Sequence, residues 1–226
     1  MTGISDLGEH NNGDRMKIFV YGAGGHAKVV IDMIECRGIH EIAFLIDDAC
    51  LKGSRFCGYE IAGGREDLEA AARAAGVTGG IIAIGDNKDR SRLAGWLGER
   101  GFEAITAVHP SAQIGSGVMI GGGTAIMPGT VINRDAILGP HVIVNTNASV
   151  DHDCCLGAFS HIAPGSTLCG TVKVGEGTLV GAGSTIIPNL TIGKSVIIRA
   201  GSTVVRDMPD AASVLGAELK LPDLVG

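Results

Sequence analysis

The sequence has few aromatic residues, little concentrated positive charge and no long apolar run. Its 226 residues include only Phe 5, Tyr 2 and Trp 1. Lysine and arginine together number 18 against 24 aspartates and glutamates, giving a net charge of −6. A general nucleic-acid-binding surface needs clustered cations, and a membrane span needs about 18 consecutive apolar residues. We therefore expect neither a nucleic-acid partner nor a membrane span.

The cysteines show no CxxC pair and no spacing typical of a zinc site. The six are Cys36, Cys50, Cys57, Cys154, Cys155 and Cys169. Disulfides are rare in the cytosol, so we interpret the six as reduced thiols of a cytoplasmic protein. Residues 1–15 are polar and lack the apolar core of a secretory signal. We interpret them as a disordered lead-in.

Glycine and aliphatic residues are abundant instead. The chain holds 36 glycines, and 45% of its residues are hydrophobic. No G-X-Y triplet repeats through it, which excludes collagen, and its low charge content with many aliphatic residues excludes intrinsic disorder. Many glycines with branched aliphatic residues favour a tightly wound β-structure with frequent corners.

Residues 16–108 alternate between strand-like and helix-like segments. We expect strands at 17–21, 42–46, 80–84 and 104–108, and helices at 27–38, 65–76 and 86–101. Alternation at this spacing is typical of βαβ units with a parallel sheet. The segment is therefore predicted to form a small Rossmann-like α/β domain.

Residues 109–206 follow a period of six. Every sixth residue from Ile114 to Val204 is Ile, Leu or Val, which makes sixteen positions without a break. This period predicts a parallel β-helix in which three hexapeptides form one coil of 18 residues and the aliphatic residue points inward. Glycine, asparagine and aspartate suit the corners because they tolerate left-handed backbone angles. We assign no contact to the tail, residues 207–226.

Several motifs, taken in order, carry a resemblance to a known family. They are Tyr21–Lys28 (YGAGGHAK), Asp47-Asp48, Ala83–Asn87 (AIGDN), His109–Ala112 (HPSA) and Val150–Asp153 (VDHD). Together they resemble the sialic-acid O-acetyltransferase family in its broad sense, which includes bacillosamine- and perosamine-type N-acetyltransferases of nucleotide-linked 4-amino-4,6-dideoxy sugars. The resemblance covers residues 16 to about 208. It implies a left-handed β-helix, a role in glycan biosynthesis, and a homotrimer that holds acetyl-CoA between neighbouring β-helices.

The glycine turn after the first strand suits a phosphate-bearing ligand. Gly22-x-Gly24-x-x-Ala27 lets the backbone approach a phosphate at a helix N-terminus. An NAD-dependent oxidoreductase is an alternative, because Asp47 stands at a suitable distance for a ribose hydroxyl. Only about 95 residues precede the β-helix, too few for a second nucleotide-binding half. The resemblance implies that the sugar nucleotide contacts Gly24, Gly25, His26, Asp47, Asp48 and Gly85.

Asp151-His152-Asp153 supplies the chemistry expected of an acyl transfer. Attack on a thioester requires a base with a pKa near neutrality, and a neighbouring carboxylate raises the pKa of a histidine and fixes its tautomer. The resemblance implies that His152 is the proton acceptor, assisted by Asp153. Gly170 lies 18 residues later, so we expect it against His152 with its N–H as an oxyanion donor. Asn145 is a weaker candidate, predicted near the same face.

His161 follows His152 by nine residues, half a coil, and is expected on the opposite side of the prism. The resemblance implies a contact with acetyl-CoA, in which His161 would meet a neighbour's His152. It also implies backbone contacts to the CoA arm from Ala182 and Ala200. Position 200 often holds glycine in the family, so Ala200 departs from the pattern.

Two other chemistries fit the sequence less well. Metal-dependent carbonic anhydrases share the β-helix but need three close histidines, whereas His141, His152 and His161 are 11 and 9 residues apart. No metal is therefore expected. Cys154 takes an inward position and is read as core, and Cys155 would need its own base to act as an acyl-carrying nucleophile.

The sequence predicts an acetyl-CoA-dependent N-acetyltransferase that acts on the 4-amino group of a nucleotide-linked 4-amino-4,6-dideoxy sugar. Transfer to a hydroxyl of a sugar or sialic acid needs the same base and stays open. A non-catalytic trimer that binds nucleotide sugars is the alternative from another class. The sequence does not distinguish UDP, GDP, CMP and dTDP.

Overall fold

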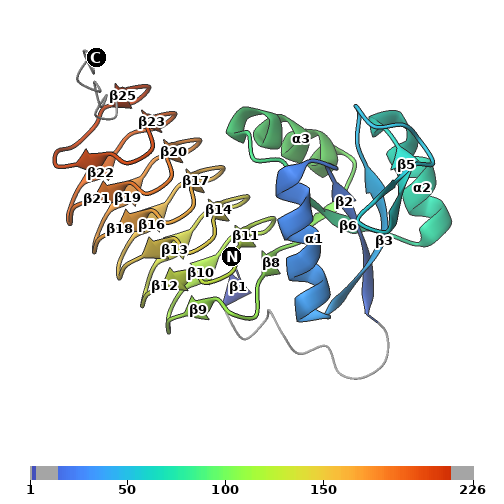
Figure 1. The fold of residues 1–226 in the computed structure, drawn as a ribbon, viewed down its shortest axis with the longest axis horizontal. Coiled ribbons are helices and arrows are strands. Elements are labelled where there is room, and N and C mark those ends of the chain that lie inside the picture. The colour runs from blue at the N-terminus through green and yellow to red at the C-terminus, as the bar shows by residue number, and fades with distance from the viewer. Residues whose placement is uncertain (1, 4–14, 215–226) are drawn as a thin grey trace, which may run out of the picture.

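The computed structural model describes residues 2–3 and 15–214, which form an α/β domain and a tall column of stacked coils (Figure 1). The predicted fold class, a Rossmann-like domain followed by a left-handed parallel β-helix, is confirmed. None of the helices in these ranges is long and apolar enough to cross a membrane.

The α/β domain is a six-stranded sheet in the order β4-β5-β3-β2-β6-β7, with all pairs parallel except β4·β5. Its elements are β2 (Met16–Tyr21), α1 (Gly25–Arg37), β3 (His40–Ile46), β4 (Arg55–Phe56), β5 (Tyr59–Gly63), a 3₁₀ turn (Arg65–Asp67), α2 (Leu68–Ala75), β6 (Gly79–Ile82), α3 (Asn87–Glu99) and β7 (Glu103–Ala104). Glycines with left-handed backbone angles end α1 and α2, at Gly38 and Gly76.

Two parts of this domain differ from the prediction. The hairpin β4·β5 was not expected, because its two-residue turn, Cys57-Gly58, has positive φ at both positions and only the glycine is typical of such a turn. The strand expected at 104–108 is split between β7, in the α/β sheet, and β8 (Ala107–Val108), which pairs with β11. The column therefore begins inside the range assigned to the first domain.

The column has three faces, each a parallel sheet. The first face is β8 (Ala107–Val108), β11 (Ala125–Ile126), β14 (Ile143–Val144), β17 (His161–Ile162), β20 (Leu179–Val180), β23 (Ile197–Ile198) and β25 (Ser213–Val214). The second is β9 (Gln113–Ile114), β12 (Val131–Ile132), β15 (Ser149–Val150), β18 (Thr167–Leu168), β21 (Thr185–Ile186) and β24 (Thr203–Val204). The third is β10 (Met119–Ile120), β13 (Ile137–Leu138), β16 (Cys155–Leu156), β19 (Lys173–Val174) and β22 (Thr191–Ile192), with β1 (Thr2–Gly3) at its edge.

Each strand of a face pairs with the strand 18 residues further on. Ile132 pairs with Val150, and Val150 pairs with Leu168; all three side chains are fully buried. A second inward position, two residues earlier, carries a serine or threonine in several coils, and some of these hydroxyls bond the next coil, such as Ser166 Oγ to Gly181 O at 2.9 Å. The corners turn on left-handed residues at every sixth position, among them Asp153 with φ 58°.

Both ends of the chain contact the column more than expected. Within the predicted disordered lead-in, Thr2–Gly3 forms β1 and pairs antiparallel with β10; residues 4–14 lie outside the described residues. Such pairing covers an otherwise open sheet edge. In the tail, Met208 bridges to Ile192 and is only 9% exposed, and β25 pairs with β23. The start of the tail therefore packs on its own column up to residue 214, and residues 215–226 lie outside the description.

The α/β domain docks on the first face of the column. Buried residues of α1, including Val30 and Ile34, join Ala125 and Ile143 of the first face in one apolar cluster. This cluster places the carboxyl ends of β2 and β6 beside the first face.

A buried arginine on α3 links the two units by hydrogen bonds. Arg90 is 1% exposed, and its five N–H donors all have partners. Nε donates to His141 O and one terminal nitrogen to Phe159 O, both at corners of the column. The remaining bonds go to Ile84 O, Gly85 O and Asn87 Oδ1 in the α/β domain. Burial lowers the pKa of Arg90 to about 10, so the guanidinium stays charged at neutral pH.

We expect Arg90→Ala to destabilise the docked α/β domain by at least about 3 kcal/mol, because five partly buried acceptors lose their donor at about 1 kcal/mol or more each. Urea unfolding followed by the fluorescence of Trp96, the single tryptophan, measures this because Trp96 lies on α3. Arg92→Ala on the same helix is the control, since Arg92 is largely exposed. A change below about 1 kcal/mol in Arg90→Ala would contradict the role of this link.

Candidate active site

His152 stands at the corner between the second and third faces. Its Nδ1 lies 2.8 Å from Asp153 Oδ2, and 57% of its side chain is exposed. The hydrogen bond to Asp153, with the charges of Asp151 and Asp153, raises the pKa of His152. A neutral ring that donates Nδ1–H to this carboxylate keeps the lone pair of Nε2 available. The pair can therefore accept a proton at an open surface.

Asp151 and Asn133 fix the backbone of this corner. The sequence motif includes Asp151 without giving it a role of its own, and Asn133 was not predicted. Asp151 Oδ1 accepts Asn133 Nδ2–H at 2.7 Å and the His152 N–H at 2.8 Å. These two bonds, led by that from Asn133, lower the pKa of Asp151. Positions 133 and 151 are 18 residues apart, which is one full coil, so the repeat alone predicts that these two side chains lie against each other.

Gly170 packs directly against the ring of His152, where the 18-residue interval predicts it. A Cβ at position 170 would lie 2.6 Å from His152 Nε2 and 2.7 Å from Cε1. The next residue, Thr171, donates its N–H to His152 O at 2.9 Å. Position 170 therefore needs glycine because of the imidazole above it.

Asn145 does not lie with His152 as predicted. It follows β14 at the corner between the first and second faces, and its Nδ2 lies 3.0 Å from His161 Nε2. Seven residues are more than one hexapeptide, so the chain has passed from one corner to the next. Asn145 Oδ1 accepts the Thr146 N–H, which leaves the amide NH₂ to donate to His161. Asn145 therefore positions His161.

His161 faces the α/β domain of its own chain. Its Nδ1 lies 3.3 Å from Gly85 O, so the ring donates from Nδ1 and accepts at Nε2. Burial, with the charge of Arg90, lowers the pKa of His161 to about 4. With both nitrogens engaged and the ring neutral at pH 7, His161 is suited to contact rather than to proton transfer.

Two further histidines surround Arg90. The ring of His26 is 6.4 Å from that of His161, and His141 stacks on Phe159 at 5.2 Å. Burial, with the charge of Arg90, lowers the pKa of both His26 and His141 to about 4. His26 Nε2 and His141 Nδ1 are buried without a protein partner among the described residues. Arg90 and His141 were not predicted, since nothing in the local sequence marks their contact.

The turn before α1 leaves room for a ligand. A Cβ at Gly24 or Gly25 would meet nothing within 4 Å, and no side chain caps α1. Gly22, by contrast, is required by the protein itself, because its φ is 120° and a Cβ would lie 2.9 Å from Ala83 O. Free N–H groups of a helix N-terminus beside open space suit a phosphate.

The carboxylates of the adjacent Asp47 and Asp48 have different hydrogen-bond partners. The Asp47 oxygens accept the backbone N–H groups of Ala23, Ala49 and Cys50, so Asp47 shapes the loops. Asp48 accepts bonds from Tyr21 Oη and from Arg65, and it lines a cavity of about 340 Å³. Asp47 lines the same cavity, but its carboxylate is occupied by three backbone N–H groups, whereas Asp48 brings its cationic partner Arg65 to the cavity wall.

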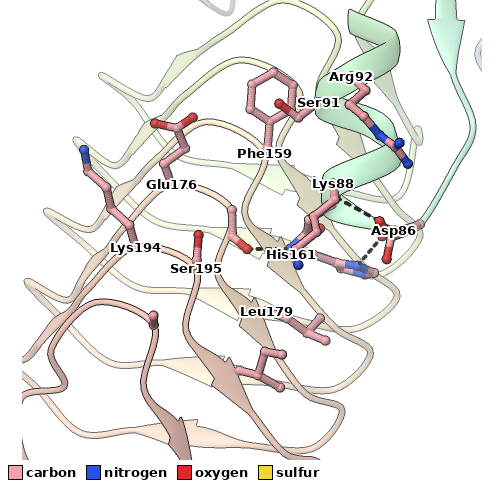
Figure 2. A pocket seen from close by; sticks show the side chains of 15 residues that line it. Asp86, Lys88, Ser91, Arg92, Phe159, His161, Glu176, Leu179, Lys194 and Ser195 are labelled. Carbon is pink, nitrogen blue, oxygen red and sulfur yellow. Dashed lines mark hydrogen bonds between the residues drawn. The ribbon is translucent and has the colours of Figure 1, made fainter.

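A larger cleft of about 1020 Å³ separates α3 from the first face (Figure 2). His161 and Leu179 form part of its floor, and the side chains of Lys88 and Lys194 come from α3's side and from the column, respectively. Gly85 also lines it. The lining also includes the carboxylates of Asp86 and Glu176. The apolar part of the floor with the ammonium groups of Lys88 and Lys194 suits an extended ligand with phosphates.

The predicted site residues of the column form two groups within one chain. His161 is on the first face, and Ala182 and Ala200 stand at the corner after it. His152 and Gly170 stand at the next corner, between the second and third faces. The α/β domain covers the first face, so it does not face His152 of its own chain.

The inward thiol Cys154 is buried, as predicted. Burial raises its pKa to about 11, and Sγ donates to Cys169 O at 3.2 Å. A buried thiol of raised pKa is a poor nucleophile.

We expect Gly170→Ala to lower the pKa of His152 toward the ordinary value, because the added methyl pushes the ring away from Asp153. An NMR titration of the histidine rings measures this, with the His152 signal assigned by its loss in His152→Gln. Gly95→Ala on α3 is the control, since a Cβ there meets nothing within 4 Å. An unchanged His152 pKa in Gly170→Ala would contradict the packing.

Family models and curated proteins match both parts of the chain. The PglD N-terminal domain model matches residues 17–97, and the bacterial transferase hexapeptide model matches 111–146 and 171–206. A GDP-perosamine N-acetyltransferase of Escherichia coli O157:H7 is 29% identical over 161 residues, 69% of this chain and 71% of the relative. A UDP-N-acetylbacillosamine N-acetyltransferase of Bacillus subtilis (strain 168) is 36% identical over 114 residues, 47% of this chain, and the match spans about half (49%) of that relative.

Solved structures match over nearly the whole chain. PerB from Caulobacter crescentus, in complex with CoA and GDP-perosamine, is 39% identical with a TM-score of 0.84, covering 89% of this chain and 95% of PerB. The acetyltransferase domain of PglB from Neisseria gonorrhoeae FA1090, in complex with acetyl coenzyme A, is 33% identical with a TM-score of 0.81, covering 89% and 96%. With the fold, the glycine turn and the His152 corner, these matches show that the chain belongs to the hexapeptide-repeat family of nucleotide-amino-sugar N-acetyltransferases.

Proposed function

We propose that the protein transfers the acetyl group of acetyl-CoA to the 4-amino group of a nucleotide-linked 4-amino-4,6-dideoxy sugar, with His152 as general base. The observation that carries this is the His152–Asp153 pair, an exposed imidazole of raised pKa with Nε2 available. The matches to enzymes named for perosamine and bacillosamine support the substrate class.

The proposed reaction is a direct attack. The neutral amine attacks the thioester carbonyl carbon, and its proton passes to His152 Nε2 as the C–N bond forms. The resulting oxyanion accepts a hydrogen bond from the Gly170 N–H. The intermediate then breaks its C–S bond, and the departing CoA thiolate takes the proton from His152. Asp153 stabilises the imidazolium while it exists, and Asp151 holds the backbone beneath it.

Two regions would hold the substrates. We assign acetyl-CoA to the cleft floor and adjoining corner at His161, Ala182 and Ala200. The cations Lys88 and Lys194 favour its phosphates. The sugar nucleotide is assigned to six residues at the strand ends of the α/β domain: Gly24, Gly25, His26, Asp47, Asp48 and Gly85. Asp47 acts there through the loop it shapes, and the cavity beside Asp48 would take the base.

The separation of these groups supports a homotrimer. A chain whose α/β domain faces away from its own His152 needs a neighbouring chain to bring the base to the substrate, and cyclic packing of three columns does so. The cysteines are all free among the described residues, which suits a reducing cytoplasm.

The test is release of free CoA thiol with acetyl-CoA and a panel of UDP-, GDP-, CMP- and dTDP-linked sugars that carry a 4-amino or a 4-hydroxyl group. We expect turnover with a 4-amino sugar and none with its 4-hydroxy counterpart. His152→Ala should lower kcat by at least about 100-fold, the usual loss for a positioned base. Transfer only to hydroxyls would establish the O-acetyltransferase alternative. Binding without CoA release would establish the scaffold, and His152→Ala with more than about a tenth of wild-type kcat would refute the mechanism.

The pH dependence of kcat tests Asp153 separately. In the wild type, activity should fall as pH decreases through the raised pKa of His152, because only the neutral ring accepts a proton. Asp153→Asn should move this decline to lower pH and reduce the plateau by roughly tenfold to a hundredfold, since the ring becomes a weaker, less oriented base. Asp135→Asn is the matched control: Asp135 is an exposed left-handed corner residue one coil above Asp153. An unchanged profile in Asp153→Asn would contradict the assignment.

A further inference from the structure

Three side chains of types that ligate metals lie close together where α1 packs against the start of the column. Asp32 and Cys36 are four residues apart on α1, so they share one face of the helix. His109 follows β8 in the column. One donor atom from each residue, a carboxylate oxygen, the thiol sulfur and an imidazole nitrogen, lies within 4.8 Å of the other two. No sequence interval reveals this group, because the docking of the two units creates it.

The donor atoms are near enough to one another for small movements to bring all three onto one ion. A tetrahedral zinc ion at about 2.0–2.3 Å from each donor sets donor–donor separations of about 3.3–3.8 Å. Asp32 and Cys36 are exposed, so small side-chain rotations on α1 can close the difference. Their carboxylate and thiolate charges together balance a divalent cation.

The ring of His109 is held in place by Ser111. Its Nδ1 lies 2.7 Å from Ser111 Oγ, and Ser111 Oγ accepts the Gly129 N–H at 3.1 Å. A ligating imidazole usually donates its second ring N–H to such an acceptor, and a hydroxyl has two lone pairs. The Ser111 N–H also donates to Nδ1, at 3.0 Å, so the proton of the neutral ring is on Nε2 in the metal-free protein. Binding of an ion at Nε2 therefore moves the ring proton to Nδ1, where Ser111 Oγ can accept it.

We propose that Asp32, Cys36 and His109 form a binding site for a divalent cation of the zinc class, with water as fourth ligand. A thiolate, an imidazole and a carboxylate together favour Zn²⁺ over Mg²⁺ or Ca²⁺, which prefer oxygen ligands alone. The ion would join α1 to the first coil and so strengthen the seat of the α/β domain. The site is independent of the proposed acyl transfer, and none of its residues belongs to that machinery.

Titration of the metal-free full-length protein with Co²⁺ tests the site, because thiolate ligation gives a sulfur-to-cobalt charge-transfer band in the near ultraviolet. We expect the band to saturate at one Co²⁺ per chain and to disappear when Zn²⁺ is added. Cys36→Ser should abolish it, and Asp32→Asn should weaken Co²⁺ binding by at least about tenfold. Cys57→Ser, at another exposed cysteine, is the control and should keep the band.

A second readout separates a structural ion from adventitious surface binding. Zn²⁺ should raise the melting temperature of the wild type and of Cys57→Ser but not that of Cys36→Ser, because an ion that binds only the folded chain stabilises it. Acetyl transfer by the metal-free protein should be unchanged in Cys36→Ser. Absence of the band, its persistence in Cys36→Ser, or a Zn²⁺ effect on melting that is the same in all variants would overturn the proposal.

Discussion

The orientation of the α/β domain on the column is fixed by one buried guanidinium, beside the apolar contacts of α1. Arg90 joins the corner carbonyls of His141 and Phe159 to the loop that carries Gly85. Both corner residues have positive φ, which is unfavourable for bulky side chains, so the fold accepts strain where their carbonyls meet Arg90. Through Gly85, the same link sets the orientation of His161. Because His161 lies in the floor of the large cleft, the hydrogen bonds of Arg90 also help to determine the shape of that floor.

The interior of the column contributes rigidity and position rather than chemistry. Its interior is uniform, with branched aliphatic side chains stacked on their own kind, so neighbouring coils are nearly interchangeable. Distinct behaviour comes from the corners, where side chains point outward. At one corner Asp151 and Asp153 surround His152 with negative charge and raise its pKa. At the first face, burial beside Arg90 lowers the pKa of His161. The same side chain thus becomes a base in one place and a neutral contact in the other.

The repeating half of the fold could be read from the sequence, because a period of six ties each residue to its neighbour 18 positions on. That rule places Gly170 under His152 and would also have placed Asn133 over Asp151. It fails for intervals that are not whole coils, which is why Asn145 was expected beside the wrong histidine. Contacts between the two units follow no period: Arg90 bonds residues 51 and 69 positions away. The hairpin β4·β5 was missed because Cys57 is an unusual residue for a left-handed turn position.

The unbroken period also restricts how this protein can change in length. An insertion of one residue within a face would turn every later inward side chain outward, so extra residues are tolerated only if they bulge from a corner. Removal of 18 residues keeps the alternation of inward and outward positions and shortens the column by one coil. Loss of a coil between β8 and β17, however, would move His161 by one coil away from Gly85 of the α/β domain. Coils can therefore be gained or lost during evolution more readily beyond those that contact the α/β domain.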